Sequence, residues 1–210
     1  GMLGMHGTAY ANMAMTDPDF VLNVGSRFDD RIVGKPDAFC RDAFIAHVDI
    51  DRDQIGKIIE PNEGIVGDGR FFLGALLKEM TLNAGKEHPD RAKWIERLNE
   101  YKRDYPLGYE TASGLSAQEV IDAVFKLTHG EAIVTADVGQ HQMWAAQFYR
   151  TKRPNTWLTS GGAGSMGFGF PAAIGAQFAK PNEQVVAFVG DGGFQMTSYE
   201  LATACNYNLP

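Results

Sequence analysis

A glycine-rich turn at residues 189–194 holds the side chain best suited to bind a cation. Asp191 stands there between Gly190 and Gly192, after an apolar run expected to form a strand and before an expected helix. A carboxylate is a preferred Mg²⁺ ligand, and glycines let a diphosphate approach the backbone closely. Ligands of parallel α/β sheets bind beyond the carboxyl ends of the strands. The turn predicts a metal–diphosphate site, although a plain strand-to-helix turn capped by Asp191 has the same composition.

A second glycine run, residues 160–169, also lies between an expected strand and an expected helix. Gly162, Gly164 and Gly167 match the G-x-G-x-x-G pattern of dinucleotide-binding loops. That pattern requires an acidic residue at the tip of the next strand to bind a ribose. The next strand leads instead to Asp191 inside its glycine turn, which suits a metal ion and phosphates better than a nicotinamide dinucleotide.

Two further segments place polar side chains directly after expected strands. Residues 139–141, Gly-Gln-His, open an expected helix, whose free N–H groups and dipole favour anions. Taken alone, His141 is equally explained as a helix cap or as a core residue. Residues 25–31 gather four charges around Phe28. They suit either a solvated turn or a polar ligand, because the planar guanidinium group matches phosphates and flavin edges.

Apolar runs and helical stretches alternate along the chain. In the first half, strands are expected at residues 20–24, 44–50 and 64–66, and a helix at residues 70–80. Strands that alternate with helices indicate parallel sheets covered on both faces. The expected fold class is therefore α/β, with two doubly wound parallel-sheet domains.

The second half repeats this alternation from Ser116, whose hydroxyl forms a candidate capping box with Glu119. A helix is expected from there to about residue 127. Further strands are expected at residues 132–136, 156–158 and 185–189. Further helices are expected at residues 143–148, at residues 172–178 with Pro171 as the first residue, and from near Thr197.

A charged segment separates the two halves. Apolar side chains at helical spacing over residues 87–103 indicate a linker helix. The predicted domains are residues 1–83 and 115–210, joined by a linker of residues 84–114. Residues 1–7 resemble a loop after an absent strand, and the second alternating series stops unfinished. The first domain is therefore expected to be truncated at its N-terminus and the second at its C-terminus.

Composition excludes several classes of protein. A net charge of −7 argues against nucleic-acid binding. No apolar run approaches the ~20 residues that span a bilayer, and the N-terminus lacks the features of a signal peptide. Cys40 and Cys205 stand outside any pairing motif, which indicates free thiols in a reducing compartment. We expect neither a nucleic-acid partner nor a membrane partner.

These segments, in their order along the chain, resemble those of acetolactate synthases, a family of thiamine-diphosphate enzymes. Residues 160–176 resemble the family's cofactor loop, and residues 138–144 its diphosphate-binding segment. Residues 1–7 and 25–31 resemble its two flavin-binding stretches. The resemblance implies that the first predicted domain is part of a central, Rossmann-like FAD-binding domain. The second predicted domain is then most of a thiamine-diphosphate-binding domain.

The resemblance also implies roles for individual residues. Met166 is then the apolar wedge that bends the cofactor, the Gly164 backbone touches its aminopyrimidine ring, and Asp191 binds Mg²⁺. The residues implied to bind thiamine diphosphate are Gly139, Gln140, His141, Gly164, Met166, Gly190, Asp191, Gly192 and Gly193. Those implied to bind FAD are Leu3, Gly4, Met5, His6, Gly7, Gly25, Arg27, Asp29, Arg31, Ile32, Asp49, Ile50, Gly67 and Asp68, with Asp30 and Arg31 at the substrate channel.

Acetolactate synthases decarboxylate pyruvate and join its two remaining carbons to a second pyruvate or to 2-ketobutyrate, in branched-chain amino-acid biosynthesis. The implied cofactors are thiamine diphosphate, Mg²⁺ and FAD. A homodimeric or homotetrameric full-length protein and a regulatory small subunit are implied too. The expected location is the cytoplasm, or a plastid or mitochondrion in a eukaryote.

No residue of this chain is expected to be catalytic. The glutamate that activates thiamine belongs to an N-terminal domain outside the chain. The Asn that completes the family's Mg²⁺ site lies beyond Pro210, because Asn206 and Asn208 come too early. The chain alone is therefore expected to be inactive.

Two other interpretations remain. One is another thiamine-dependent enzyme with the same three-domain plan, such as a glyoxylate carboligase or a pyruvate oxidase. The other is a stand-alone nucleotide-binding module without catalysis. The charged residues 27–31 and the segment 139–141 favour acetolactate synthase, and the two unfinished domains argue against a stand-alone module.

Overall fold

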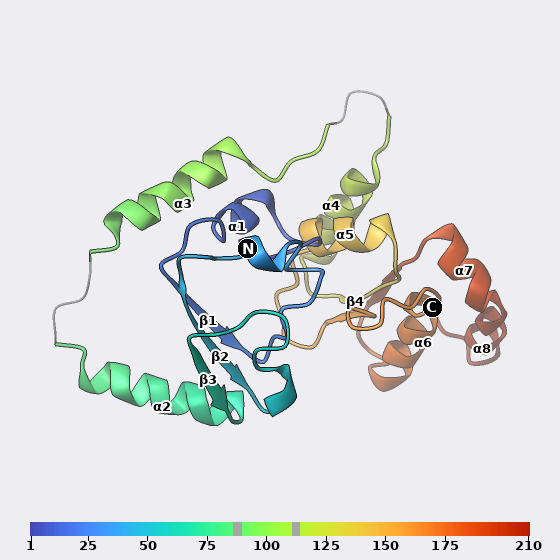
Figure 1. Cartoon of the computed structure of the whole chain (residues 1–210). Helices are drawn as coiled ribbons and strands as arrows, with labels where there is room; N and C mark the ends of the chain where they lie inside the picture. The colour runs from blue at the N-terminus through green and yellow to red at the C-terminus, as the bar shows by residue number, and fades with distance from the viewer. Residues whose placement is uncertain (86–89, 111–113) are drawn as a thin grey trace. The chain divides into compact units, whose positions relative to one another are not determined.

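The computed structural model describes residues 1–85, 90–110 and 114–210. The chain forms two compact units, Gly1–Pro106 and Leu107–Pro210. Each unit contains a three-stranded parallel sheet accompanied by helices (Figure 1). The expected α/β class with parallel sheets is confirmed. Within the described residues, no helix combines the length and the apolar character needed to cross a membrane.

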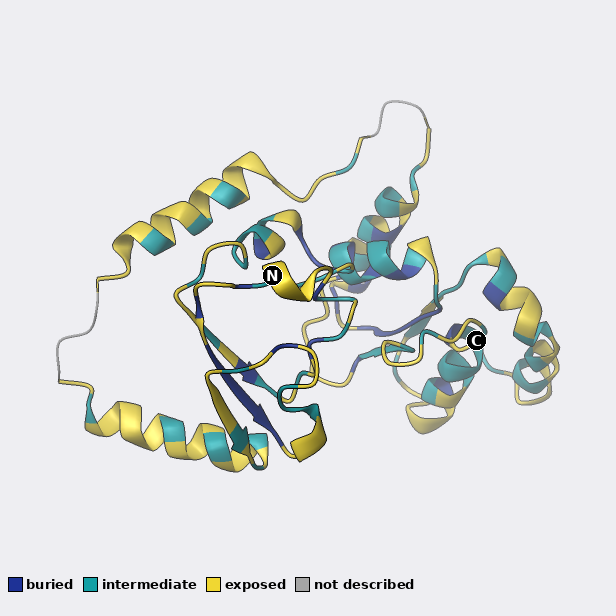
Figure 2. Cartoon of the chain, viewed as in Figure 1, coloured by how far each residue is buried: buried dark blue, intermediate teal, exposed yellow. Residues whose placement is uncertain are grey.

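The sheet of the first unit consists of β1 (Phe20–Val24), β2 (Phe44–Asp49) and β3 (Glu63–Val66), in that order. All three predicted strands are confirmed to within a residue. The central strand β2 is buried from its second residue onward, because it has a partner strand on each side (Figure 2). All three strands point the same way, so their carboxyl ends meet at one edge of the sheet.

Short helices and one long helix surround this sheet. The long predicted helix is α2 (Gly69–Leu82), and its first turn is capped by the Asp68 carboxylate, which accepts hydrogen bonds from the N–H groups of Arg70 and Phe71. Three short elements have no counterpart among the predictions: α1 (Ala9–Met13) and the 3-10 turns η1 (Pro36–Ala38) and η2 (Arg52–Gln54). They are too short for an apolar period to reveal them.

The predicted linker helix is α3 (Ala92–Asp104). Its expected start at residues 87–89 lies outside the described residues. Trp94, Leu98 and Tyr101 are half-buried, so one stripe of the helix is partly covered, whereas Ile95, expected on the same stripe, is exposed. Arg97 forms an exposed ion pair of 3.4 Å with Asp17, within the first unit. The proposed linker boundaries stay a prediction.

The second unit alternates helices and strands throughout. It runs α4 (Ala117–Thr128), β4 (Ile133–Ala136), α5 (Gln140–Phe148), β5 (Trp157–Thr159), α6 (Gly169–Ala179), β6 (Val185–Phe188), α7 (Asp191–Thr197), η3 (Ser198–Glu200) and α8 (Leu201–Asn206). The Ser116 hydroxyl accepts a hydrogen bond from the Glu119 N–H at 3.2 Å, which is the first half of the predicted capping box. The core lies around β4, whose residues are all buried (Figure 2).

The strand order β5-β4-β6 contains a reversal of direction. The chain moves from β4 to its neighbour β5 through α5, then passes β4 to β6 through α6. Such a reversal makes the carboxyl ends of β4 and β6 a switch point, which is where ligands of open α/β sheets bind. Residues 137–139 and 189–191 follow these two strand ends.

Helices α5 and α6 begin before their expected starts. Helix α5 begins at Gln140 instead of residue 143. Helix α6 begins at Gly169, so Pro171 is its third residue instead of its first. The helix expected to open near Thr197 is present as η3, for which Thr197 is the N-cap, followed by α8, whereas the separate helix α7 (Asp191–Thr197) was not expected. Glycine has a low intrinsic helix propensity, so the start of α6 was placed too late and the glycine-containing α7 was not expected.

Candidate functional site

At the switch point of the second unit, the His141 ring lies against two glycines. Gly139 caps α5 and Gly190 caps α7, so the two residues precede helices at neighbouring strand ends. A Cβ atom at either glycine would lie 2.8 Å from Cε1 of the ring, so a side chain at either position would displace the imidazole. The first residues of α5 and α7 are thereby brought together around one imidazole.

One nitrogen of the His141 ring has no hydrogen-bond partner in the described residues. This nitrogen, Nε2, is buried. Burial lowers the pKa of His141, and the negative charges of Asp137 and Asp191 oppose that shift. A buried nitrogen without a hydrogen bond is energetically costly. A polar ligand that forms a hydrogen bond with Nε2 would remove this cost.

Asp191 is the first residue of α7 and is exposed. The helix places free N–H groups beside it, because the first four amides of a helix have no partner within the helix. Within the described residues, no group of three or more His, Cys, Asp or Glu side chains gathers as a metal site. A cation bound at Asp191 would therefore take its other ligands from oxygens of a bound molecule or of other chain segments.

The glycine run 160–169 reaches the same region. Its turn is closed by Ser160, whose carbonyl accepts from the Gly164 N–H at 3.0 Å and whose hydroxyl accepts from the Ser165 N–H at 2.9 Å. Gly164 has a φ of +66°, a conformation that glycine adopts without strain. Half-exposed Met166 lies beside α7, because a Cβ atom on Gly192 would be 3.1 Å from its Cε.

Asp137, which directly follows β4, holds this run in place. Its carboxylate is fully buried and accepts three backbone hydrogen bonds, from Val138 at 2.7 Å, Gly167 at 3.0 Å and Gly169 at 2.7 Å. Asp137 is not among the residues predicted from sequence. The signal was the polar pair Thr135 and Asp137 in an otherwise apolar strand, which predicts two polar side chains on one face.

In the first unit, the two segments expected to bind flavin lie side by side. The Met5 N–H donates to the Arg31 carbonyl at 2.7 Å, and a Cβ atom on Gly4 would lie 2.2 Å from that oxygen. The Gly7 N–H donates to the Gly4 carbonyl at 2.9 Å, and half-buried His6 stands between them. The backbone of residues 1–7 is thus folded tightly against residues 29–32.

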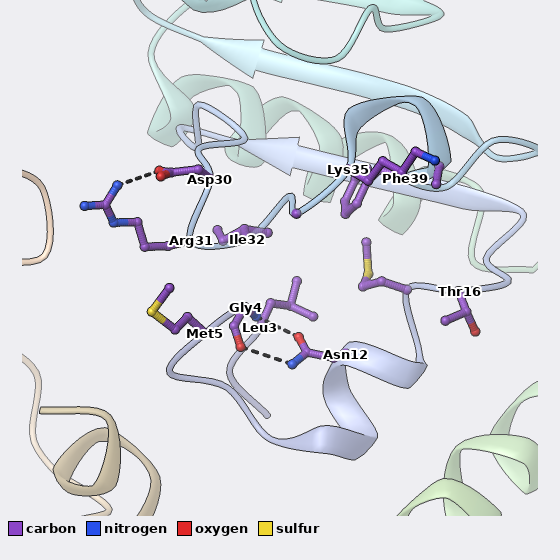
Figure 3. Close-up of a pocket in the computed structure, with 13 residues that line it drawn as sticks. Leu3, Gly4, Met5, Asn12, Thr16, Asp30, Arg31, Ile32, Lys35 and Phe39 are labelled. Atoms are coloured by element: carbon purple, nitrogen blue, oxygen red, sulfur yellow. Dashed lines mark hydrogen bonds and ion pairs between the residues drawn. The ribbon is translucent and has the colours of Figure 1, made fainter. Parts of the chain in front are cut away.

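A pocket of about 560 Å³ opens between these segments (Figure 3). Figure 3 shows Leu3, Gly4 and Met5 on one side and Asp30, Arg31 and Ile32 on the other. Helix α1 contributes Asn12, whose side-chain amide accepts from the Gly4 N–H at 2.7 Å and donates to the Gly4 carbonyl at 3.0 Å. No sequence signal identified Asn12, because its role depends on a contact across the loop.

Most charges of residues 25–31 are satisfied locally and at the surface. Arg27 pairs with Asp29 at 3.1 Å, and Arg31 with Asp30 at 2.5 Å. The hydrogen bond from Arg31 lowers the pKa of Asp30, whose side chain is exposed. Phe28, at the centre of the run, points instead into the core and meets the buried His47 ring edge-on, with 5.1 Å between ring centres.

The remaining predicted flavin residues follow the carboxyl ends of β1, β2 and β3. Gly25 and Gly67 donate their N–H groups to Val48 and Asp49 carbonyls at 2.8 and 2.9 Å, so the three strand ends are linked. Asp49 is buried and its carboxylate accepts from the Asp51 N–H, whereas Ile50 is exposed. These residues line one edge but are not part of the lining of the pocket in Figure 3.

Two family models match these two units. Residues 1–76 match the thiamine pyrophosphate enzyme central domain, and residues 137–210 match the C-terminal TPP binding domain of the same enzymes. The first unit is thus a central domain of this kind, and the switch point of the second lies within the TPP-binding match. Each unit of the chain is thus similar to a domain of the thiamine pyrophosphate enzymes.

Within this family, all 210 residues are similar to acetolactate synthases. The chain is 46% identical to the acetolactate synthase large subunit of Lactococcus lactis and covers 36% of its length. It is 47% identical to acetolactate synthase 1, chloroplastic, of Nicotiana tabacum and to acetolactate synthase, chloroplastic, of Arabidopsis thaliana, covering 32% and 31% of their lengths. The chain therefore spans about a third of these relatives. They do not favour a nicotinamide-binding protein, another thiamine enzyme or a non-catalytic module.

Proposed function

We propose that these residues belong to the catalytic subunit of an acetolactate synthase. In this proposal the second unit binds thiamine diphosphate with Mg²⁺, and the first unit binds part of FAD. The observation that carries the proposal is the meeting of the α5 and α7 N-termini around His141, whose Nε2 has no partner among the described residues. Helix N-termini favour phosphate groups, and Asp191 stands at the first position of α7 for a cation.

Different residues of the second unit bind different parts of thiamine diphosphate. Asp191 ligates Mg²⁺, and the glycines at positions 190, 192 and 193 let the diphosphate approach the α7 backbone. Residues 139–141 contact the diphosphate from α5. Met166 props the bent cofactor and the Gly164 backbone meets its aminopyrimidine ring. Thiamine diphosphate, when bound, supplies the carbanion chemistry that protein side chains lack. The protein binds it, shapes it and keeps water away.

The first unit contacts FAD through its two adjoining loops. Leu3, Gly4, Met5, Arg31 and Ile32 support this role because they line one pocket of about 560 Å³ (Figure 3). His6, Gly7, Gly25, Arg27 and Asp29 extend the contact along the same loops. The adenosine end lies along Asp49, Ile50 and residues 67–68 at the strand ends. Asp30 and Arg31 border the substrate channel.

The complete protein, in this proposal, decarboxylates pyruvate and joins the two-carbon product to pyruvate or 2-ketobutyrate. It acts as a homodimer or homotetramer and takes a regulatory small subunit. The glutamate that activates thiamine lies outside this chain, so the 210 residues alone form no acetolactate. The location is the cytoplasm in a bacterium and an organelle in a eukaryote. Residues 1–83 and 115–210 are the two domains, with residues 84–114 as their linker.

Calorimetric titration of the complete polypeptide with thiamine diphosphate and Mg²⁺ tests this function. The expected result is stoichiometric binding by the wild type, loss of binding in Asp191→Ala, and unchanged binding in Asp122→Ala as a matched control. Asp122 pairs with Lys126 in α4, outside the proposed site. Acetolactate formation from pyruvate is assayed in parallel. Wild-type protein without affinity for thiamine diphosphate, or undiminished binding by Asp191→Ala, would overturn the assignment.

A further inference from the structure

Two side chains, one in β4 and one directly after it, bind both backbone polar groups of Gly169, the first residue of α6. Thr135 and Asp137 stand two positions apart at β4 and are fully buried. The Thr135 hydroxyl donates to the Gly169 carbonyl at 2.8 Å, and the Asp137 Oδ2 accepts from the Gly169 N–H at 2.7 Å. Asp137 Oδ1 also accepts from the Gly167 N–H at 3.0 Å. We call these two side chains the β4 clamp.

The β4 clamp has no room for adjustment. A Cβ atom on Gly169 would lie 2.7 Å from the Asp137 backbone nitrogen, and one on Gly193 would lie 2.6 Å from Asp137 Oδ1. The start of α6 and the first turn of α7 therefore both pack directly on Asp137. One buried carboxylate touches the glycine run on one side and the predicted metal-binding turn on the other.

This contact fixes Met166 relative to α7. Met166 lies one residue before Gly167, whose N–H binds Asp137. A Cβ atom on Gly167 would lie 3.3 Å from Met196 Cβ and from Thr197 Cγ2, so the loop is already seated on α7. The end of the loop is thus tied to β4 by hydrogen bonds and to α7 by packing. Its shape is set by the protein's own groups.

We propose that Thr135 and Asp137 are positioning residues, which hold the glycine run 160–169 in the conformation that thiamine diphosphate requires. The proposal rests on the function proposed above. Neither side chain touches the cofactor in this proposal; both act through the backbone of Gly167 and Gly169. A loop ordered before binding loses less conformational entropy when the ligand binds, so its affinity is higher.

Hydrogen exchange of the complete, cofactor-free polypeptide tests the first half of this proposal. Asp137→Asn keeps the shape of the side chain but leaves one acceptor oxygen where the carboxylate uses two. One backbone donor is then unsatisfied, and the amides of residues 160–169 should exchange about tenfold faster or more. Asp122→Asn is the matched control in the same unit, and exchange of that segment should stay as in the wild type. Unchanged exchange in Asp137→Asn overturns the proposal.

Calorimetry with thiamine diphosphate and Mg²⁺ tests the second half. The Kd should rise about tenfold in Asp137→Asn and in Thr135→Val, in line with the loss of one buried hydrogen bond. Thr135→Ser restores the hydroxyl and should return the Kd to near the wild-type value, whereas Asp122→Asn should not change it. Faster exchange with an unchanged Kd would show a purely structural contact and would refute the positioning role. If the wild type itself does not bind, the proposed function fails and the positioning role fails with it.

Discussion

In the first unit, the charged side chains that follow β1 pair with each other at the surface, as Arg27 does with Asp29 and Arg31 with Asp30. In the second unit, the carboxylate that follows β4 is fully buried and is satisfied by three backbone N–H groups. Exposed ion pairs are screened by water and contribute little, whereas hydrogen bonds to a buried charged group are among the stronger ones. The two sites are therefore ordered to different degrees before any ligand arrives.

The comparison also concerns glycine. In the second unit, glycines 139, 169, 190 and 193 each face a side chain or backbone atom that leaves no space for a Cβ atom. In the first unit, Gly4 and Gly7 are packed just as closely against backbone atoms, whereas Gly25 and Gly67 face open space at the edge where a ligand is proposed. Glycine thus serves close internal packing in both sites, and at the strand ends of the first unit it leaves an open surface.

The largest effect is expected for Gly169→Ala. The added Cβ atom would lie 2.7 to 3.0 Å from Asp137 backbone and Cβ atoms that have no freedom to move. We expect a loss of about 3 kcal/mol in the free energy of unfolding, since overpacking displaces well-packed neighbours. Urea denaturation measures it, with Gly162→Ala as the control because nothing lies within 4 Å of a Cβ atom there. Equal midpoints for the two variants would contradict the tight packing of Asp137.

Gly190→Ala should cost about 1–2 kcal/mol, because a side chain, His141, stands in the way and can partly yield. The double variant Gly190→Ala with His141→Ala separates this clash from any other effect of the methyl group. We expect the cost of Gly190→Ala to fall to near zero in the His141→Ala background, which a double-mutant cycle measures. A cost that is the same in both backgrounds would show that His141 is not the residue the alanine meets.

Cys40 provides a reporter for the first unit. Its thiol is buried, donates to the Met15 carbonyl at 3.3 Å, and lies next to Phe39, which lines the pocket with Met15. Burial raises the pKa of the Cys40 thiol, so little reactive thiolate is present at neutral pH. We expect saturating FAD to slow alkylation of Cys40 about tenfold, because a ligand that binds the closed form suppresses opening.

This alkylation is measured by mass spectrometry in a Cys205→Ser background, since Cys205 is exposed in this chain. Thiamine diphosphate without FAD is the matched control and should leave the rate unchanged. If FAD does not change the alkylation rate, the flavin does not bind in this pocket.

The smallest effect is expected for Asp30→Asn. The hydrogen bond from Arg31 lowers the pKa of Asp30, but the pair is solvent-accessible. We expect no measurable change in the thermal unfolding temperature, in line with other exposed pairs. Asp137→Asn, measured alongside, should lower it clearly. A large destabilisation by Asp30→Asn would remove the contrast drawn between the two units.

The strands and their order of appearance were predictable from sequence, because apolar runs such as 20–24 and 44–49 end at glycine or acidic residues. The start of α6 was not, because tertiary contacts set it. Gly169 enters the helix while its N–H is bound by Asp137 and its carbonyl by Thr135. No local propensity encodes those partners.

The candidate sites divide in the same way. The residue types of the glycine turn at Asp191 and of the segment 139–141 pointed to phosphates and a metal before any coordinates. Their meeting around His141 depends on β6 pairing with β4, which lies about fifty residues earlier in the chain. The two hydrogen bonds between Asn12 and Gly4 depend likewise on the path of a loop. Sequence indicated the chemistry of these residues, and the fold determined which of them meet.

The position of Asp137 also affects when the second unit can fold during synthesis. Its carboxylate leaves the ribosome 30 and 32 residues before the glycines that satisfy it. Until those glycines are synthesised, the Asp137 carboxylate stays hydrated, and β4 stays exposed to solvent with it. Contacts that span such separations form late, because closing the intervening chain costs entropy first. The second unit should therefore mature in one cooperative step, and a nascent chain stalled before Gly169 should remain open to chaperones and proteases.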